Sequence, residues 1–204
     1  MVHARALRLL TRAPDRVEPP CPYFERCGGC QYQHVDPKSQ TSFKQEILRE
    51  TLRRIGKITW DEEIPSHAAH PWNYRNQAQL KLTHTVDDSH QVGFFEAESH
   101  RLVPIDACLI LSPRLNMILA ELRGGEWSQY LKGCREIEML ADDRDDQVML
   151  TLRGDMTAET GELLAGNLMS RLPSVISAAF EVRNRFRVFG KPALMYTVGN
   201  YSIK

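Results

Sequence analysis

Alternating apolar and polar residues predict a strand over residues 76–83. Ala78, Leu80 and Leu82 fall on one face, whereas the residues between them are polar. Shorter runs of the same kind predict further strands at 92–95, 102–105, 135–141, 147–153, 174–182 and 194–203. An acidic turn at 142–146 separates two of these runs, which predicts a hairpin.

Apolar residues at helical spacing predict three helices. Asp36-Pro37 begins the first, which Gly56 ends, and Ser112-Pro113 begins the second. The third runs from about Thr157 to Leu172. The predicted inward residues are Phe43, Ile47, Leu48, Leu52 and Ile55, then Leu115, Ile118, Leu119 and Leu122, then Leu163, Leu164, Leu168 and Leu172. Arg49 and Arg53, interleaved with glutamates, are interpreted as a solvated face. Strands with intervening helices favour an α+β fold with a mixed or antiparallel sheet and about three helices.

Composition narrows the class of protein. Lys plus Arg and Asp plus Glu both number 26, so the net charge is zero, whereas a stand-alone RNA-binding protein is usually basic. The basic residues form two clusters, Arg5 to Arg16 and Arg183 to Lys191. No run is apolar enough for a membrane helix, and arginines interrupt the N-terminus where a signal peptide would be apolar. These features predict a cytoplasmic monomer that binds neither membranes nor DNA.

The most informative motif is Cys21-x5-Cys27-Gly28-Gly29-Cys30. Three thiols within ten residues indicate a metal-binding loop in a reducing compartment. The two glycines allow the backbone to wrap tightly. A fourth ligand must come from elsewhere, and Cys108 is the best candidate because it lies between a predicted strand and a predicted helix. Cys134 is interpreted as a plain core or surface thiol.

Two metals compete for this loop. Structural zinc usually takes two short cysteine pairs, whereas three ligands from one loop plus one distant cysteine favour a 4Fe-4S cluster. A zinc-stabilised nucleic-acid- or protein-binding module without enzymatic activity is therefore the alternative function. A ferredoxin-like electron carrier is a third, less favoured one, and small buried cysteines without metal are the plain interpretation.

The sequence from Glu18 through Cys30 to His34 resembles the iron–sulfur RNA uracil-5-methyltransferases. The resemblance continues through Tyr74-Arg75-Asn76, Val92 to Phe95, Ser99 to Val103 and Ile110 to Pro113. It implies that Cys21, Cys27, Cys30 and Cys108 hold the 4Fe-4S cluster. It also implies methylation of C5 of uridine with S-adenosylmethionine in ribosomal or transfer RNA, of which 23S rRNA is the favoured one. Relatives often have proline where this chain has Leu109, and basic residues where it has Glu96 and Glu98.

The resemblance also implies a domain organisation. Residues 1–13 match the tail of an N-terminal TRAM-like barrel, 14–57 the iron–sulfur loop and helix, and 58–204 the central RNA-binding α+β domain. The catalytic domain is expected to be absent, because no Gly-x-Gly run for a cofactor cradle occurs in the sequence. S-adenosylmethionine would then bind only the full-length enzyme, and this chain alone would be inactive.

Candidate RNA contacts lie at strand ends. Recognition of single-stranded RNA favours aromatic rings for bases and basic side chains for phosphates. Arg75, Lys81 and Arg101, with Tyr74, Phe94 and Phe95 nearby, offer such groups. Each of them is also compatible with an ordinary structural role.

Overall fold

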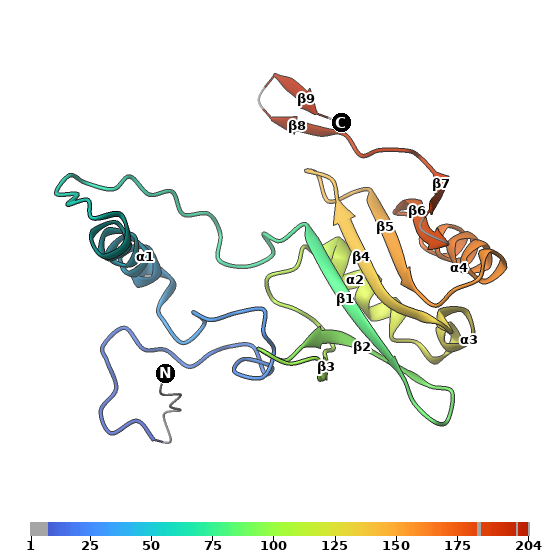
Figure 1. Ribbon diagram of the computed structural model, residues 1–204, viewed down its shortest axis with the longest axis horizontal. Coiled ribbons are helices and arrows are strands. Elements are labelled where there is room, and N and C mark those ends of the chain that lie inside the picture. Colours follow the sequence, from blue (N-terminus) through green and yellow to red (C-terminus); the bar gives the residue numbers. More distant parts are fainter. Residues whose placement is uncertain (1–7, 183–184, 199, 204) are drawn as a thin grey trace. The chain divides into compact units, whose positions relative to one another are not determined.

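The computed structural model describes residues 8–182, 185–198 and 200–203 (Figure 1). The chain divides into two compact units, which are described separately below. The first comprises Met1–Phe24 and Cys30–Ala69, and the second comprises Glu25–Gly29 and His70–Lys204. Most of the segment expected to match a TRAM-like strand, together with Arg5 and Arg183, lies outside the described residues.

The first unit is built around helix α1, Pro37–Thr51. As predicted, the Asp36 side chain caps it by accepting a hydrogen bond from Lys38 N at 2.9 Å. The π-turn η1, Leu52–Gly56, extends the helix, and Lys57 ends it in the left-handed conformation. The apolar stripe predicted for this helix is not part of a core: no residue of α1 is buried, and Ile47 and Ile55 are 50% and 79% exposed.

The segment after α1 folds back along the helix. Arg49 donates from Nε to Trp60 O and from Nη2 to Glu62 O, at 3.3 and 3.4 Å. Gln45 Nε2 donates to Ile64 O at 2.7 Å. Arg49 is exposed, as the interpretation of a solvated face predicts, and its guanidinium also binds backbone carbonyl groups. Arg53 instead forms an exposed ion pair with Glu50.

The second unit contains a seven-stranded sheet in the order β3-β2-β1-β4-β5-β6-β7. The strands are β1 Gln77–His84, β2 His90–Phe95, β3 Leu102–Pro104, β4 Cys134–Ala141, β5 Val148–Gly154, β6 Val175–Val182 and β7 Arg185–Gly190. All neighbours are antiparallel except β5 and β6, which run parallel. A parallel pair needs a crossover connection, and helix α4, Ala158–Arg171, provides it. The mixed sheet agrees with the fold class predicted from the sequence.

Helices cover one face of this sheet. Helix α2, Pro113–Leu122, begins at the Ser112 cap and lies behind β1 and β4 in Figure 1. The short elements η2, Gly125–Trp127, and α3, Ser128–Leu131, follow it. The core between helices and sheet consists of residues such as Leu80, Leu115, Ile118, Trp127, Ile137, Leu150, Leu164, Leu168 and Phe180, each at most 1% exposed.

Three details differ from the sequence prediction. Leu163 was expected to face inward but is 55% exposed, because Gly161, Leu164, Ala165 and Leu168 form the buried side of α4. Strand β7 was not predicted. The single strand expected at 194–203 is instead a hairpin of β8, Tyr196–Val198, and β9, Tyr201–Ile203.

This hairpin is tied to the turn between β4 and β5. Tyr196 Oη donates to Ala141 O at 2.5 Å, and Thr197 N donates to Asp143 Oδ2 at 3.2 Å. Burial, reinforced by the charges of Asp142 and Asp143, raises the pKa of the Tyr196 phenol. The phenol therefore stays protonated and can keep donating this hydrogen bond.

The packing of α4 on β6 predicts opposite effects for two identical substitutions. A Cβ at Gly161 would lie 2.4 Å from Cδ2 of the buried Phe180 ring, whereas one at exposed Gly166 meets nothing within 4 Å. We expect Gly161→Ala to lower the free energy of unfolding by about 1–3 kcal/mol through overpacking. Gly166→Ala should raise it by about 0.5–1 kcal/mol through helix propensity. Urea unfolding followed by tryptophan fluorescence measures both, and equal effects would contradict this packing.

Candidate functional site

The five cysteines fall into two groups. Cys21, Cys27, Cys30 and Cys108 are half-buried, whereas Cys134 is fully buried in β4. Burial raises the pKa of the Cys134 thiol to about 12. The thiol donates weak hydrogen bonds to Glu136 O and Arg153 O, at 3.4 and 3.8 Å. Cys134 is therefore a protonated core thiol, which confirms its interpretation as a structural residue. A buried thiol of this kind is chemically inert.

The backbone around Cys27 is fixed to the edge of the sheet within the second unit. Gly28 N donates to Phe95 O at 3.0 Å, and Cys27 forms an isolated antiparallel bridge with Glu96. A Cβ at Gly28 would lie 3.2 Å from the Ala97 backbone and from Phe95 O. Glycine at this position thus allows the cysteine loop to approach the end of β2 closely.

Cys108 is held by a residue that the sequence analysis missed. Asn116 of α2 accepts a hydrogen bond from Cys108 N and donates one to Cys108 O, both at 2.9 Å. Its amide also donates to Leu111 O at 3.2 Å. An asparagine inside a helix is unfavourable unless its side chain has another use. That local conflict with helix propensity was the available signal for Asn116.

The part of the cysteine loop that belongs to the first unit is held by hydrogen bonds within that unit. Cys21 N donates to Gln33 Oε1 at 3.3 Å, and Phe24 N donates to Cys21 O at 3.1 Å. Val17 N donates to His34 O at 3.0 Å, beside the isolated bridge between Arg16 and Val35. These bonds close the chain around Cys21 and Cys30, although residues 14–36 contain no regular helix or strand.

The four side chains predicted to bind a metal are all thiols, which soft metals favour as ligands. Four half-buried thiols are suited to iron or zinc, and the one fully buried thiol is separate from them. Among the described residues, no group of three or more His, Cys, Asp and Glu side chains is arranged to hold a metal ion. The cluster ligands therefore remain a prediction from the sequence.

Of the three predicted RNA contacts, Lys81 is the most constrained. Its Nζ forms an ion pair with Glu136, and its side chain is only 19% exposed. Glu136 also accepts from Arg153 Nη1 at 2.8 Å, and the same guanidinium donates to Glu138 at 3.0 Å. We call Lys81, Glu136, Glu138 and Arg153 the sheet ion-pair network. It lies on the sheet face opposite the helices and balances two positive charges with two negative ones.

Arg101 and Arg75 are placed differently. Arg101 pairs with Glu96 at 2.5 Å across the turn between β2 and β3, and its side chain is 75% exposed. Their hydrogen bonds lower the pKa of Glu96 and raise that of Arg101. Arg75 uses its backbone to join segments, because Arg75 N donates to Ile110 O and Arg75 O accepts from Ser112 N. Lys81 Nζ lies 5.3 Å from the Phe95 ring centroid, so Lys81 and Arg101 both lie near the end of β2.

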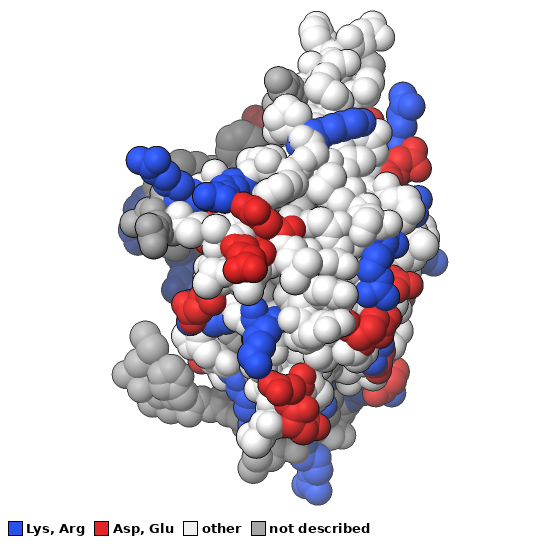
Figure 2. Space-filling view, turned by 90° about the vertical axis from the view of Figure 1, so that its right-hand side faces the viewer, with Lys and Arg blue, Asp and Glu red and all other residues white. Residues whose placement is uncertain are grey.

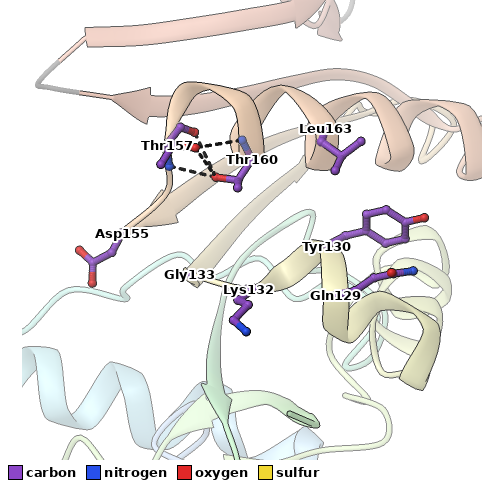
Figure 3. Close-up of a pocket in the computed structure, with 8 residues that line it drawn as sticks. All are labelled: Gln129, Tyr130, Lys132, Gly133, Asp155, Thr157, Thr160 and Leu163. Carbon is purple, nitrogen blue, oxygen red and sulfur yellow. Dashed lines mark hydrogen bonds between the residues drawn. The ribbon is translucent and has the colours of Figure 1, made fainter.

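A shallow pocket of about 250 Å³ lies between α3, the start of β4 and the N-terminus of α4 (Figure 3). It is lined by Gln129, Tyr130, Lys132, Gly133, Asp155, Thr157, Thr160 and Leu163. Thr157 and Thr160 bond reciprocally at the helix start, at 2.9 and 3.2 Å. Because these helix-start groups already have partners within the protein, we assign no ligand to the pocket.

Charges of both signs are interspersed on the side of the second unit where α4 lies (Figure 2). Ion pairs of α4 account for part of this pattern, including Arg187 with Glu162 and Arg171 with Glu126. The basic cluster predicted near the end of the chain is therefore partly neutralised. No described helix is long and apolar enough to cross a bilayer.

Known proteins resemble this chain over most of its length, although no family model matches it. An uncharacterized RNA methyltransferase of Enterococcus faecalis is 41% identical over 113 residues, 54% of this chain and 25% of that protein. The 23S rRNA (uracil(1939)-C(5))-methyltransferase RlmD of Alkalilimnicola ehrlichii is 34% identical over 170 residues, 82% of this chain and 35% of that protein. The chain thus spans about a quarter to a third of the length of these curated relatives.

A solved structure shares the fold. The Pyrococcus abyssi tRNA (uracil-54, C5)-methyltransferase, in complex with S-adenosyl-L-homocysteine, matches 96% of this chain and 46% of that chain with a TM-score of 0.64. The sequence identity of 20% supports likeness of fold alone. Together with the sequence relatives, these findings place the chain in the RNA methyltransferase family. Its named relatives there are uracil-C5 methyltransferases of 23S rRNA.

The sheet ion-pair network predicts a specific pH dependence. Burial opposes ionisation of Glu136, but hydrogen bonds from Lys81 and Arg153 outweigh it, so the pKa of Glu136 is lowered in the folded protein. Its stabilising effect is therefore complete above the unfolded pKa of about 4.3 and is lost as pH falls through the lower folded value. Glu136→Gln should cost about 1–3 kcal/mol at pH 7. It should also flatten the dependence of unfolding free energy on pH below about pH 5.

Urea unfolding at several pH values tests this, with Glu121→Gln on the exposed side of α2 as the control. The control should lie within about 0.5 kcal/mol of wild type. A Glu136→Gln variant that retains the wild-type pH dependence would show that Glu136 does not carry this effect.

Proposed function

We propose that this chain is the cluster-binding and RNA-binding part of an RNA uracil-C5 methyltransferase. The observation that carries the proposal is the 34% identity with the 23S rRNA enzyme of A. ehrlichii over 82% of the chain. The RNA proposed is 23S rRNA rather than tRNA, because the tRNA enzyme of similar fold shares only 20% of its residues with this chain. We also propose that the protein is a monomer and that it is cytoplasmic, where its thiols stay reduced.

In this proposal, Cys21, Cys27, Cys30 and Cys108 hold a 4Fe-4S cluster. Their half-buried thiols and the two hydrogen bonds between the Asn116 side chain and the Cys108 backbone support the assignment. Methylation at C5 of uracil needs a thiolate that adds to the ring and a base that removes the C5 proton, and it needs no electron. When bound, the cluster would supply cross-linking of the cysteine segments, so its role is structural.

The methyl-transfer chemistry is proposed to lie outside these 204 residues. A nucleophilic cysteine must be accessible and readily deprotonated. Cys134 has neither property, since it is fully buried and has a pKa of about 12. No Gly-x-Gly run for S-adenosylmethionine occurs in the sequence. S-adenosylmethionine is therefore a cofactor of the whole enzyme.

Arg75, Lys81 and Arg101 are the RNA contacts proposed on the second unit. Arg101 is the most available, because its guanidinium is exposed and can exchange the Glu96 carboxylate for a phosphate. Lys81 contributes mainly through its place in the sheet ion-pair network.

The metal assignment predicts that protein purified without oxygen contains iron and sulfide and absorbs broadly in the visible range. Cys108→Ser should lose most of the cluster and lower the folding stability, since metal binding is coupled to folding. Elemental analysis and absorbance spectra provide the measurement. About one zinc per chain with no sulfide would support the zinc-stabilised module instead.

Cys134→Ser is the matched control for Cys108→Ser. It makes the same replacement of sulfur by oxygen, but in the core of the sheet, and it should leave the iron content at the wild-type level. Loss of iron in the Cys134 variant, with retention in the Cys108 variant, would overturn the ligand assignment.

Because the nucleophile, the base and the S-adenosylmethionine site are proposed to lie outside these residues, we expect the chain to transfer no methyl group by itself. With labelled S-adenosylmethionine and uridine-containing RNA, incorporation should equal that of a sample without protein. RNA affinity should fall steeply as salt rises, and Arg75→Ala with Arg101→Ala should lower both the affinity and the salt dependence. Lys132→Ala with Arg135→Ala, two exposed cations elsewhere on the second unit, provides the control. Incorporation above background would reveal an active site within these residues.

A further inference from the structure

Positive charge is concentrated where α1 ends and η1 follows it. Residues 49–57 contain Arg49, Arg53, Arg54 and Lys57 but only one acidic residue, Glu50, so this segment has a net charge of +3 although the whole chain is neutral. Arg53 and Arg54 both lie near Glu50, at 2.7 and 3.9 Å, and their side chains are 64% and 71% exposed. One carboxylate thus faces two guanidinium groups.

Exposed apolar groups accompany this charge. Ile55, Ile58 and Trp60 are 79%, 49% and 42% exposed. Arg49 holds the Trp60 carbonyl, and Ile58 N donates to Leu52 O at 3.0 Å, so the segment that carries the indole is fixed to the helix. An aromatic ring on a fixed backbone beside arginines is the combination that binds single-stranded nucleic acid.

Lys57 adds an independent observation. Its φ of 54° lies in the left-handed region, where a residue with a side chain is strained by about 1–2 kcal/mol and glycine is not. Strained residues that persist in a fold are frequently found at functional sites. The lysine is exposed, and its position directly follows the π-turn, a helix irregularity that is also frequent at functional sites.

We propose that the segment from Arg53 to Trp60 is an RNA-contact site. In it, Arg53, Arg54 and Lys57 bind phosphates, and a single-stranded base stacks on Trp60. The inference rests on the proposed function in its choice of RNA as the partner. It assigns a contact to the first unit, in addition to the contacts proposed at Arg75, Lys81 and Arg101 of the second unit.

Intrinsic fluorescence gives a direct test in the full chain. Of the three tryptophans, Trp60 is 42% exposed, Trp72 is half-buried and Trp127 is fully buried. A base stacked on Trp60 should quench part of the emission, and Trp60→Phe separates that part from the emission of Trp72. The probe is an RNA hairpin with a uridine-rich single-stranded loop, compared with a fully paired duplex of the same length. We expect the hairpin to quench the tryptophan emission and the duplex to quench it little. In the Trp60→Phe protein, the quenching that comes from Trp60 should be absent. Trp60→Ala should weaken hairpin binding by about 5- to 150-fold.

The charge contribution is tested with Arg54→Ala combined with Lys57→Gly. The slope of log affinity against log salt should decrease by about 1 to 1.5, because two phosphate contacts on a single strand are lost. Lys57→Gly alone should leave the unfolding free energy unchanged or raised, since glycine relieves the left-handed strain, yet it should weaken RNA binding. A purely structural role of Lys57 would not produce that combination. The Lys132→Ala, Arg135→Ala protein again provides the charge-matched control.

Two results would overturn the inference. In the first, the hairpin binds with wild-type affinity and salt dependence to all variants of Arg54, Lys57 and Trp60, which would leave the proposed function intact. In the second, wild-type protein binds no RNA at any salt concentration. The iron and sulfide content is measured without RNA, so it reports on the cluster assignment independently of either result.

Discussion

The pairing of β1 with β4 is the interaction on which the second unit depends. It joins the β1–β2–β3 meander to the β4–β5–β6–β7 half, over the register from Gln77 opposite Leu140 to Lys81 opposite Glu136. The two central strands bury Leu80, Ile137 and Met139 on the helix side, and on the other side they carry the sheet ion-pair network. Without this pair, the edge that receives the Cys27 segment and the strands that pack on α4 would belong to separate sheets.

Local signals were sufficient to predict much of this architecture. The alternation around Leu80 predicts β1 because one face of that strand is buried and the other is not. Ser112-Pro113 and Thr157 mark the starts of α2 and α4 because their side chains satisfy backbone N–H groups that have no partner within the helix. β7 was missed because its register depends on β6, and Arg185 and Arg187 obscure the apolar pattern of an exposed edge strand.

The candidate site was less predictable from sequence. The cysteine spacing indicates ligands, but it contains no information about Asn116, whose bonds to Cys108 arise only when α2 packs beside the loop. Likewise, Arg49 looks like any solvated arginine of a helix until the segment at Trp60 folds back onto it. Side chains that bind backbone groups outside their own helix require the tertiary structure, because their partners are not encoded at a fixed spacing.

The tie between the terminal hairpin and the β4–β5 turn has a mechanical consequence. Although residues 196–203 follow edge strand β7 in the chain, Tyr196 and Thr197 are bonded to Ala141 and Asp143. A force applied at β9 would therefore load the turn after central strand β4 before it could peel β7 from the sheet. The hydrogen bonds of Tyr196 and Thr197 would therefore have to break before tension on the chain at β9 reached the edge strand β7.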